Sequence, residues 1–256
     1  MIPLVGQSIA RIEDRDLLCG RGRFVADIKM PGMLHASFVR SPHAHARIVA
    51  IDARAALALP GVAAVLTVND MRAVAKTDRL VVALPDRAYK QQRDRPILAS
   101  DATVHVGEAI AMVLATDAYV AEDGAGLVEV QFELLPAVAD CRAALAPDAP
   151  RVHSGAADNL AAAFTTGYGD VDAAFASAAH IVKESFWLHR GCASAMECRG
   201  CVASYDPVDD KLVLWTSTQT PLVAARLLAE LLGRDESSVR VIASDVGGGF
   251  GPKLVF

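Results

Sequence analysis

The stretch 109–133, AIAMVLATDAYVAEDGAGLVEVQFE, decides the fold class. Its first seven residues are apolar, which is typical of a buried strand. Asp117 then stands where a helix N-cap belongs, and the segment to about residue 127 predicts a helix that Gly124 and Gly126 weaken. Residues 128–133 alternate apolar and polar side chains, which indicates a second strand with one buried face. A strand, a helix and a strand in succession indicate an α/β unit.

The residues before this stretch repeat the alternation with shorter elements. Three segments predict strands: 33–40 (MLHASFVR), 48–51 (IVAI) and 62–68 (VAAVLTV). Between the last two, Asp52 is expected to cap a helix that runs to Leu57 and stops at Pro60-Gly61.

The residues after it predict a second α/β segment. Thr220 and Pro221 are expected to open a helix as its cap and first-turn residue, and Gly233 to end it. The sequence also predicts a helix at 171–178, a long strand at 180–189, strands at 200–205 and 211–218 joined by a turn at 206–210, and a strand at 239–243. We therefore expect the α/β (α+β) class.

A stretch rich in Ala, Pro, Asp and Gly, 136–160, shows no clean period and suggests a domain boundary. The sequence predicts a first α/β domain with an N-terminal arm over 1–140, a linker over 141–160 and a second domain over 161–256. No internal repeat of fixed period is visible.

The composition argues against two classes of binding partner and against a membrane-spanning segment. The net charge is −5, the isoelectric point is near 5.8, and no run concentrates Lys and Arg, so we expect neither nucleic acid nor anionic lipid as a partner. The apolar stretch 55–68 is shorter than the ~18 residues of a membrane-spanning helix and contains a Pro-Gly break. The first 16 residues lack the pattern of a secretory signal. The expectation is a cytoplasmic protein without a transmembrane segment.

Two sets of possible metal ligands carry weak signals. The five cysteines are odd in number and irregularly spaced, which favours reduced thiols, and Cys198-x2-Cys201 leaves a redox pair open as the alternative. His43 and His45 could face one side of a strand, but nothing nearby completes a metal site, so we expect structural histidines.

A glycine-rich loop follows the last predicted strand: SDVGGGFGPK at 244–253. A dinucleotide fingerprint would need a third glycine where Pro252 or Lys253 stands, and a phosphate loop would need Gly-Lys-Ser/Thr without the intervening proline. What remains is a run of exposed N–H groups at 248–251, which predicts an anion-binding concavity. A plain glycine-rich turn is the alternative.

Five stretches together resemble one family. They are GRGRFVADIKMPGMLHASFVRSPHAHARI (20–48), VGEAIAMVLATDAYVAEDGAGLVEVQFELLPAV (106–138), MECRGCVASYD (196–206), WTSTQTP (215–221) and VGGGFGPK (246–253). In this order they resemble the N-terminal part of the molybdenum-bearing large subunit of the xanthine oxidase family, nearest to the carbon monoxide dehydrogenase and aldehyde oxidase types. The resemblance implies a hammerhead domain over roughly 18–130 and a molybdopterin-binding region from near residue 155.

The resemblance also implies roles for particular residues. Gln219 would hydrogen-bond an oxo ligand of molybdenum, and the loop residues Gly248, Gly249, Phe250 and Gly251 would contact the molybdopterin cofactor, which in some members carries a cytosine dinucleotide. No residue would coordinate the metal directly. Glu108 and Glu197 are not expected to be catalytic, because the base of this family lies further along a full-length chain.

The implied activity is that of part of an enzyme. The whole would oxidise an aldehyde, an N-heterocycle or carbon monoxide with water as oxygen source, and would pass electrons to iron-sulfur clusters and FAD on partner subunits. The chain departs from the family pattern in having Cys198 where proline is common and Leu254 where purine-oxidising members are often acidic. The remaining part of the molybdenum subunit is a further expected partner, and the isolated chain is expected to be inactive. A folded fragment that binds no cofactor and a nucleotide-binding oxidoreductase remain as alternatives.

Overall fold

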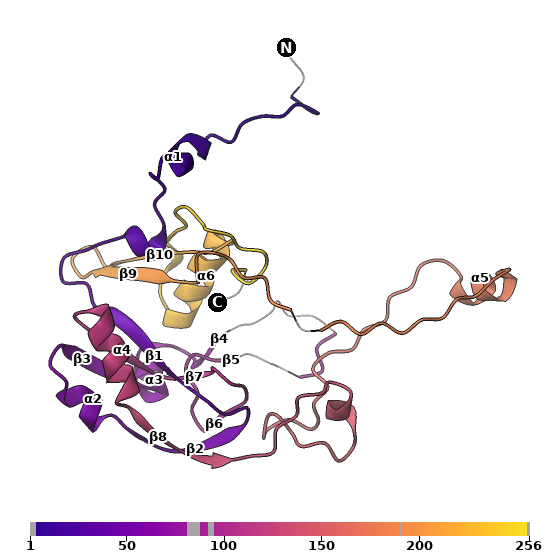
Figure 1. The fold of residues 1–256 in the computed structure, drawn as a ribbon, viewed down its shortest axis with the longest axis horizontal. Helices are drawn as coiled ribbons and strands as arrows, with labels where there is room; N and C mark the ends of the chain where they lie inside the picture. The colour runs from indigo at the N-terminus through magenta and orange to yellow at the C-terminus, as the bar shows by residue number, and fades with distance from the viewer. Residues whose placement is uncertain (1–3, 81–87, 92–94, 190, 255–256) are drawn as a thin grey trace. The chain divides into compact units, whose positions relative to one another are not determined.

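A computed structural model describes residues 4–80, 88–91, 95–189 and 191–254, which form two compact units (Figure 1). The central unit comprises Gly32–Cys192, and the terminal unit joins Met1–Pro31 to Ala193–Phe256. Reciprocal hydrogen bonds hold the N-terminal segment in the terminal unit: the Arg23 amide donates to the Asp245 carboxylate (2.6 Å), and the Asp245 amide donates to the Arg23 carbonyl (3.1 Å). The sequence had instead assigned these first residues to the α/β domain.

The central unit contains mixed, short elements. Its elements are β1 (His35–Arg40), β2 (Ala46–Asp52), α2 (Arg54–Ala58), β3 (Val62–Leu66), α3 (Val68–Val74), β4 (Arg79–Leu80), β5 (Arg95–Pro96), β6 (Ala102–Thr103), β7 (Ala109–Ala115), α4 (Ala118–Gly126), β8 (Glu129–Leu134), η2 (Ala143–Leu145) and α5 (Val171–Ser177).

Two three-stranded antiparallel sheets organise this unit. Strand β7 lies between β1 and β3, and β2 lies between β6 and β8. Helix α4 packs against β1 and β7 (Figure 1). A core forms around Ala56, Val113 and Val128, which are at most 8% exposed. Strand β7 is central and apolar, and four of its side chains are completely buried: Ile110, Ala111, Val113 and Ala115.

The opening prediction for 109–133 is confirmed. Strand β7 has the predicted bounds, and the Asp117 side chain caps α4 by accepting hydrogen bonds from the amides of Tyr119 (2.8 Å) and Val120 (3.4 Å). The predicted capping role of Asp52 is wrong by one residue: the N-cap of α2 is Ala53. Asp52 precedes it, and its carboxylate accepts a hydrogen bond from the Arg54 amide and pairs with the Arg54 guanidinium. That pairing lowers the Asp52 pKa to about 2.

The predicted strand at 180–189 is wrong. Residues 179–189 form neither helix nor strand and are exposed, including Phe186 and Leu188. A strand needs a neighbour to accept its hydrogen bonds, and no strand among the described residues pairs with this segment. The apolar residues of this segment alone therefore did not suffice to form a strand.

Helix α3 was not predicted, although its start carries a signal. Thr67 and Asp70 form a capping box, in which the Asp70 carboxylate accepts from the Thr67 amide at 2.7 Å. Those hydrogen bonds hold the pKa of Asp70 below its ordinary value.

The terminal unit holds a second, smaller α/β arrangement. Its elements are α1 (Asp14–Leu18), η1 (Val25–Asp27), β9 (Cys201–Asp206), β10 (Lys211–Thr216), α6 (Pro221–Leu232), η3 (Glu236–Ser238) and β11 (Val239–Ile242). Strand β10 is the middle strand: β9 pairs with it antiparallel and β11 parallel. The parallel pair is joined through α6, which begins with Pro221 and ends at Gly233 in the left-handed conformation, as predicted.

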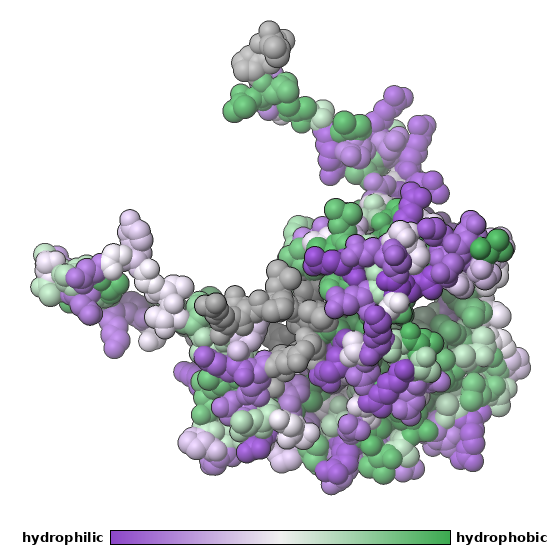
Figure 2. All heavy atoms as spheres, turned by 180° about the vertical axis from the view of Figure 1, so that it is seen from behind, coloured by the Kyte–Doolittle hydropathy of each residue, from purple (hydrophilic) through white to green (hydrophobic). Residues whose placement is uncertain are grey.

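Apolar residues reach the surface in several places, mixed with polar ones (Figure 2). Among the described residues, no helix has both the length and the apolar character that crossing a bilayer requires.

We predict that Val113→Ala destabilises the central unit by about 2 kcal/mol, because the lost methyl groups leave a cavity at a position with no exposure. Val49→Ala is the matched control, since Val49 in β2 is 60% exposed and should change the free energy of unfolding little. Urea unfolding of both variants measures the difference, and equal midpoints would contradict the assignment of the core.

Candidate functional site

The parallel crossover brings two sequence motifs to one edge of the terminal sheet. The S-T-Q-T motif, 217–220, follows the end of β10. The glycine-rich stretch follows β11, and from this point the name glycine loop means residues 246–254. Because β10 and β11 are parallel, their carboxyl ends lie at the same edge, which is where open α/β sheets place ligands. Motifs about 30 residues apart in sequence thus become neighbours.

The motif and the loop are joined by hydrogen bonds along their length. The carbonyl of Lys253 accepts from the Gln219 amide (3.0 Å) and from the Thr218 hydroxyl (3.2 Å). Thr220 stands at the N-cap of α6, as predicted, but its hydroxyl donates to the Leu254 carbonyl (3.3 Å) and makes no capping hydrogen bond to the helix. The loop is therefore held by the motif's backbone and hydroxyl groups.

The side chain of Gln219 is oriented by the loop. Its amide oxygen accepts a hydrogen bond from the Gly251 N–H at 2.9 Å. This contact places Oε1 toward the loop and leaves the Nε2 amino group with no partner in the part of the chain that the structure describes. Gln219 is exposed, so Nε2 is available as a neutral donor to a ligand.

Backbone conformation explains two of the four glycines in the loop. Gly248 has φ +96° and Gly251 has φ +98°, which glycine adopts without strain, and Phe250 also has a positive φ, 52°. Gly249 is required for a different reason: a Cβ there would lie 2.5 Å from Cδ of Gln219. The aromatic ring of Phe250 is largely exposed, at 71%.

Of the four N–H groups at 248–251 that were predicted to be free for a ligand, three are free within the described part of the chain. The Gly251 N–H is occupied by Gln219, whereas the N–H groups of Gly248, Gly249 and Phe250 have no partner among the described residues. Successive backbone amides without acceptors are the feature from which anion-binding loops are built.

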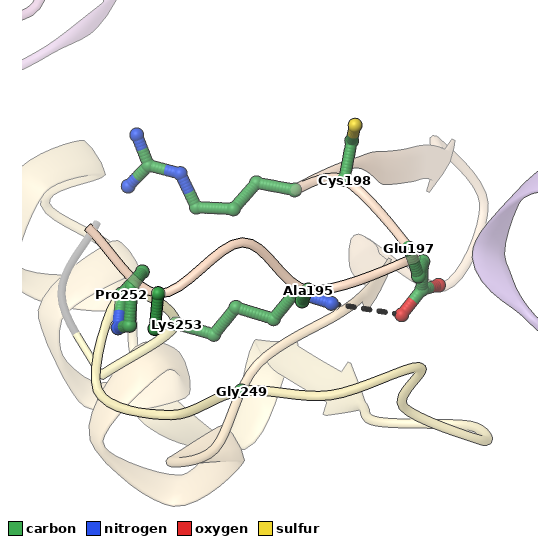
Figure 3. A pocket seen from close by; sticks show the side chains of 8 residues that line it. Ala195, Glu197, Cys198, Gly249, Pro252 and Lys253 are labelled. Atoms are coloured by element: carbon green, nitrogen blue, oxygen red, sulfur yellow. Dashed lines mark hydrogen bonds and ion pairs between the residues drawn. The ribbon is translucent and has the colours of Figure 1, made fainter. Parts of the chain in front are cut away.

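A buried ion pair lies behind the loop. The Lys253 ammonium contacts the Glu197 carboxylate at 2.9 Å, and their side chains are 2% and 15% exposed (Figure 3). The same oxygen, Oε2, accepts from the Ser217 hydroxyl and from the Gly247 amide. Burial alone would raise the pKa of Glu197, but these donors together outweigh it and hold the pKa below its ordinary value. Glu197 is thus ionised at neutral pH and is poorly suited to accept a proton.

The sequence analysis did not predict the ion pair between Glu197 and Lys253. A carboxylate and a lysine within two of the matched motifs, 196–206 and 246–253, were a usable signal. A small pocket next to the pair is lined by, among others, Ala195, Cys198, Arg199, Gly249 and Pro252 (Figure 3).

The other candidate residues do not assemble a site. Cys198 and Cys201 are exposed and form no disulfide, and no three His, Cys, Asp or Glu residues among those described could hold a metal ion. In the central unit His43 packs edge-on against Phe132, and His45 Nδ1 contacts the Pro136 carbonyl at 2.7 Å. The Glu108 carboxylate accepts from the Val104 amide.

We predict that Gly249→Ala displaces the Gln219 side chain, because the added methyl group and Cδ cannot both occupy the present space. The Gly251 amide then loses its acceptor and should exchange with deuterium at least tenfold faster. Gly167→Ala is the control, since its Cβ would meet nothing within 4 Å. An unchanged exchange rate at the Gly251 amide would contradict the prediction and would mean that the loop backbone moves while the Gln219 side chain stays in place.

Comparison with known proteins places these features in a family. Residues 19–136 match the family described as aldehyde oxidase and xanthine dehydrogenase, a/b hammerhead domain, and residues 152–256 match the molybdopterin cofactor-binding domain. The nicotine 6-hydroxylase large subunit of Paenarthrobacter nicotinovorans is 39% identical over 98% of this chain and 30% of its own. The carbon monoxide dehydrogenase large chain of Afipia carboxidovorans is 39% identical over 95% of this chain and 31% of its own.

A solved structure agrees in fold. The structure of quinoline 2-oxidoreductase from Pseudomonas putida 86 superposes with a TM-score of 0.88 at 40% identity, over 97% of this chain and 31% of that one. The chain thus spans about a third of the length of these relatives. With a hammerhead domain followed by part of a molybdopterin-binding domain, the chain belongs to the xanthine oxidase family of molybdenum hydroxylases and corresponds to the N-terminal portion of the large subunit.

Proposed function

We propose that this chain forms one wall of a molybdenum cofactor pocket in an oxidoreductase that hydroxylates or oxidises a small molecule with water as oxygen source. The observation that carries the proposal is the junction between the S-T-Q-T motif and the glycine loop. There the Nε2 group of Gln219 and the N–H groups of Gly248, Gly249 and Phe250 are left without partners among the described residues.

These residues fit a molybdopterin cofactor. A metal-oxygen centre and a negatively charged pterin phosphate both call for hydrogen-bond donors, and this edge offers four donors without partners among the described residues: Nε2 of Gln219 and the N–H groups of Gly248, Gly249 and Phe250. The missing side chain at Gly249 keeps the backbone open beside Gln219, since any Cβ would fill that space. Gln219, Gly248, Gly249, Phe250 and Gly251 would hold the cofactor, and none of them would coordinate the metal.

When bound, the cofactor supplies a two-electron redox centre at which oxygen from water enters the substrate. The contribution of this chain is binding and orientation. Nε2 of Gln219 donates one hydrogen bond without adding charge, and its direction is fixed in advance because Oε1 is already held by Gly251. A donor fixed before the reaction stabilises developing charge without reorganisation.

The substrate class follows from the relatives and from one residue. The relatives' names include nicotine, carbon monoxide and quinoline. Leu254, immediately after the loop lysine, is apolar, which supports an aldehyde, an N-heterocycle such as a pyridine, or carbon monoxide more than a purine. The general base, the rest of the molybdenum subunit, and iron-sulfur and FAD subunits would complete the enzyme in the cytoplasm.

Metal analysis of the complete protein, purified with the subunits that accompany it, tests the proposal. We expect molybdenum and a fluorescent oxidised pterin in stoichiometric amounts, together with dye-linked oxidation of an aldehyde, an N-heterocycle or carbon monoxide. Absence of both molybdenum and pterin would leave a folded protein without the cofactor and would overturn the proposal, and tight binding of a nicotinamide or adenine nucleotide would favour a nucleotide-binding oxidoreductase.

We predict that Gln219→Ala lowers kcat per bound molybdenum about a hundredfold, because loss of one fixed donor at a charged reaction centre costs about 3 kcal/mol. Gln131→Ala, at an exposed position of β8 in the central unit, is the control and should keep the parent rate. Steady-state kinetics normalised to molybdenum content measures the change, and an unaltered rate at full loading would argue against the role of Gln219.

A further inference from the structure

A single carboxylate connects three separate segments of the terminal unit. Oε2 of Glu197 accepts hydrogen bonds from the Ser217 hydroxyl, the Gly247 amide (2.8 Å) and the Lys253 ammonium (2.9 Å). Ser217 precedes Gln219 by two residues, Gly247 stands at the start of the glycine loop, and Lys253 stands at its end. One atom therefore fixes both ends of the loop and the beginning of the motif.

The backbone adds a second connection at the start of the loop. The Glu197 amide donates to the Gly247 carbonyl (3.2 Å), while the Gly247 amide donates to the Glu197 carboxylate. A Cβ at Gly247 would come within 2.5 Å of Cβ of Glu197, so this close approach requires glycine. The conformation of the loop's first residue thus depends on Glu197 through two hydrogen bonds and one steric contact.

The end of the loop transmits the position of Glu197 to Gln219. The ammonium of Lys253 is held by Glu197, and the carbonyl of the same lysine accepts from the amide of Gln219 (3.0 Å). Gly251, two residues before Lys253, donates to the Gln219 side chain. A shift of Lys253 would therefore move both the backbone and the side-chain amide of Gln219.

The burial of Lys253 makes its pairing with Glu197 important for stability. The Lys253 side chain is 2% exposed, and Glu197 is the only carboxylate that it contacts among the described residues. Removing one partner from a buried ion pair leaves an uncompensated charge, which is far more costly than removing both. The remaining oxygen of Glu197, Oε1, is buried without a partner among the described residues, which leaves room for one further donor such as a water molecule.

We propose that Glu197 is a positioning residue, whose ion pair with Lys253 fixes the glycine loop and the amide of Gln219 in the arrangement that receives the cofactor. This inference rests on the proposed function for the identity of the ligand. The hydrogen bonds by which Glu197 holds the loop lie within this chain and do not depend on that identity. Glu197 acts through Gln219 and Lys253 and does not act on the substrate.

The test compares Glu197→Gln, Lys253→Met and the double variant in the complete protein. Glu197→Gln keeps the shape but removes the charge, and the double variant removes both charges. Glu133→Gln is the matched control, because it breaks the exposed pair with Arg47 in the central unit, whose side chains are both 60% exposed. Hydrogen–deuterium exchange at the amides of Gln219 and Gly251 reports the loop, and exchange in β10, the middle strand of the terminal sheet, checks that the terminal unit remains folded.

We expect at least tenfold faster exchange at both amides in each single variant, slower exchange again in the double variant, and no change in the control. Exchange within twofold of the parent in Glu197→Gln would overturn the proposal. So would equal loosening in the double and single variants, because a coupled pair must show partial rescue. Ser217→Ala, which removes one donor and keeps the ion pair, should give a smaller change and serves if the single charge variants fail to fold.

Kinetics of the molybdenum-loaded protein separates positioning from simple loss of structure. Glu197→Gln should lower kcat per bound molybdenum at least tenfold with KM within threefold of the parent, since no substrate contact is removed. Unchanged kcat per molybdenum would count against positioning. If the parent contains no molybdenum while the exchange results follow expectation, the proposed function fails and the positioning of the loop stands.

Discussion

The buried carboxylate of Glu197 is the interaction on which the terminal unit's ligand edge depends. A loop made largely of glycine has almost no side chains with which to bury itself, so its conformation must be set by groups outside it. Glu197 supplies an acceptor to both ends of that loop, and the loop in turn holds Gln219. The energetic cost of burying a charge is offset by Lys253 and by two further donors, which is why the pKa of the carboxyl is lowered despite its burial.

Topology brings these groups together in the first place. The β10–α6–β11 crossover places two loops at one edge of a parallel pair, and α6 starts within that edge at Pro221. The N-terminal end of a helix favours negative charge, and the free amides of Gly248, Gly249 and Phe250 add to it. The edge therefore offers a group of donors that are free within the described residues, whereas three of its acceptors, Oε1 of Gln219, Oε2 of Glu197 and the carbonyl of Lys253, already accept hydrogen bonds from within the unit.

Local signals predicted the longer helices and strands, and the failures have two causes: a pairing partner that is missing among the described residues and a local signal that is short. The strand at 109–115 and the helix capped by Asp117 follow from their own residues. The segment 180–189 has a strand-like pattern but no pairing partner, and helix α3 depends on a capping box of only two residues. At the site, the glycines indicated an anion-binding loop, and the resemblance indicated Gln219. The contact of Gly249 with Gln219 and the ion pair of Glu197 join residues 30 to 56 positions apart, which no single-sequence pattern encodes.

Gly249 and the side chain of Gln219 share one small volume, and this has an evolutionary consequence. A side chain at position 249 is accommodated only if residue 219 becomes smaller or moves, so the two positions are expected to vary together among homologous sequences. The same holds for redesign: a library that varies residue 219 alone samples only the side chains compatible with the bare backbone opposite. Randomising positions 219 and 249 jointly would open pocket shapes that stepwise selection cannot reach.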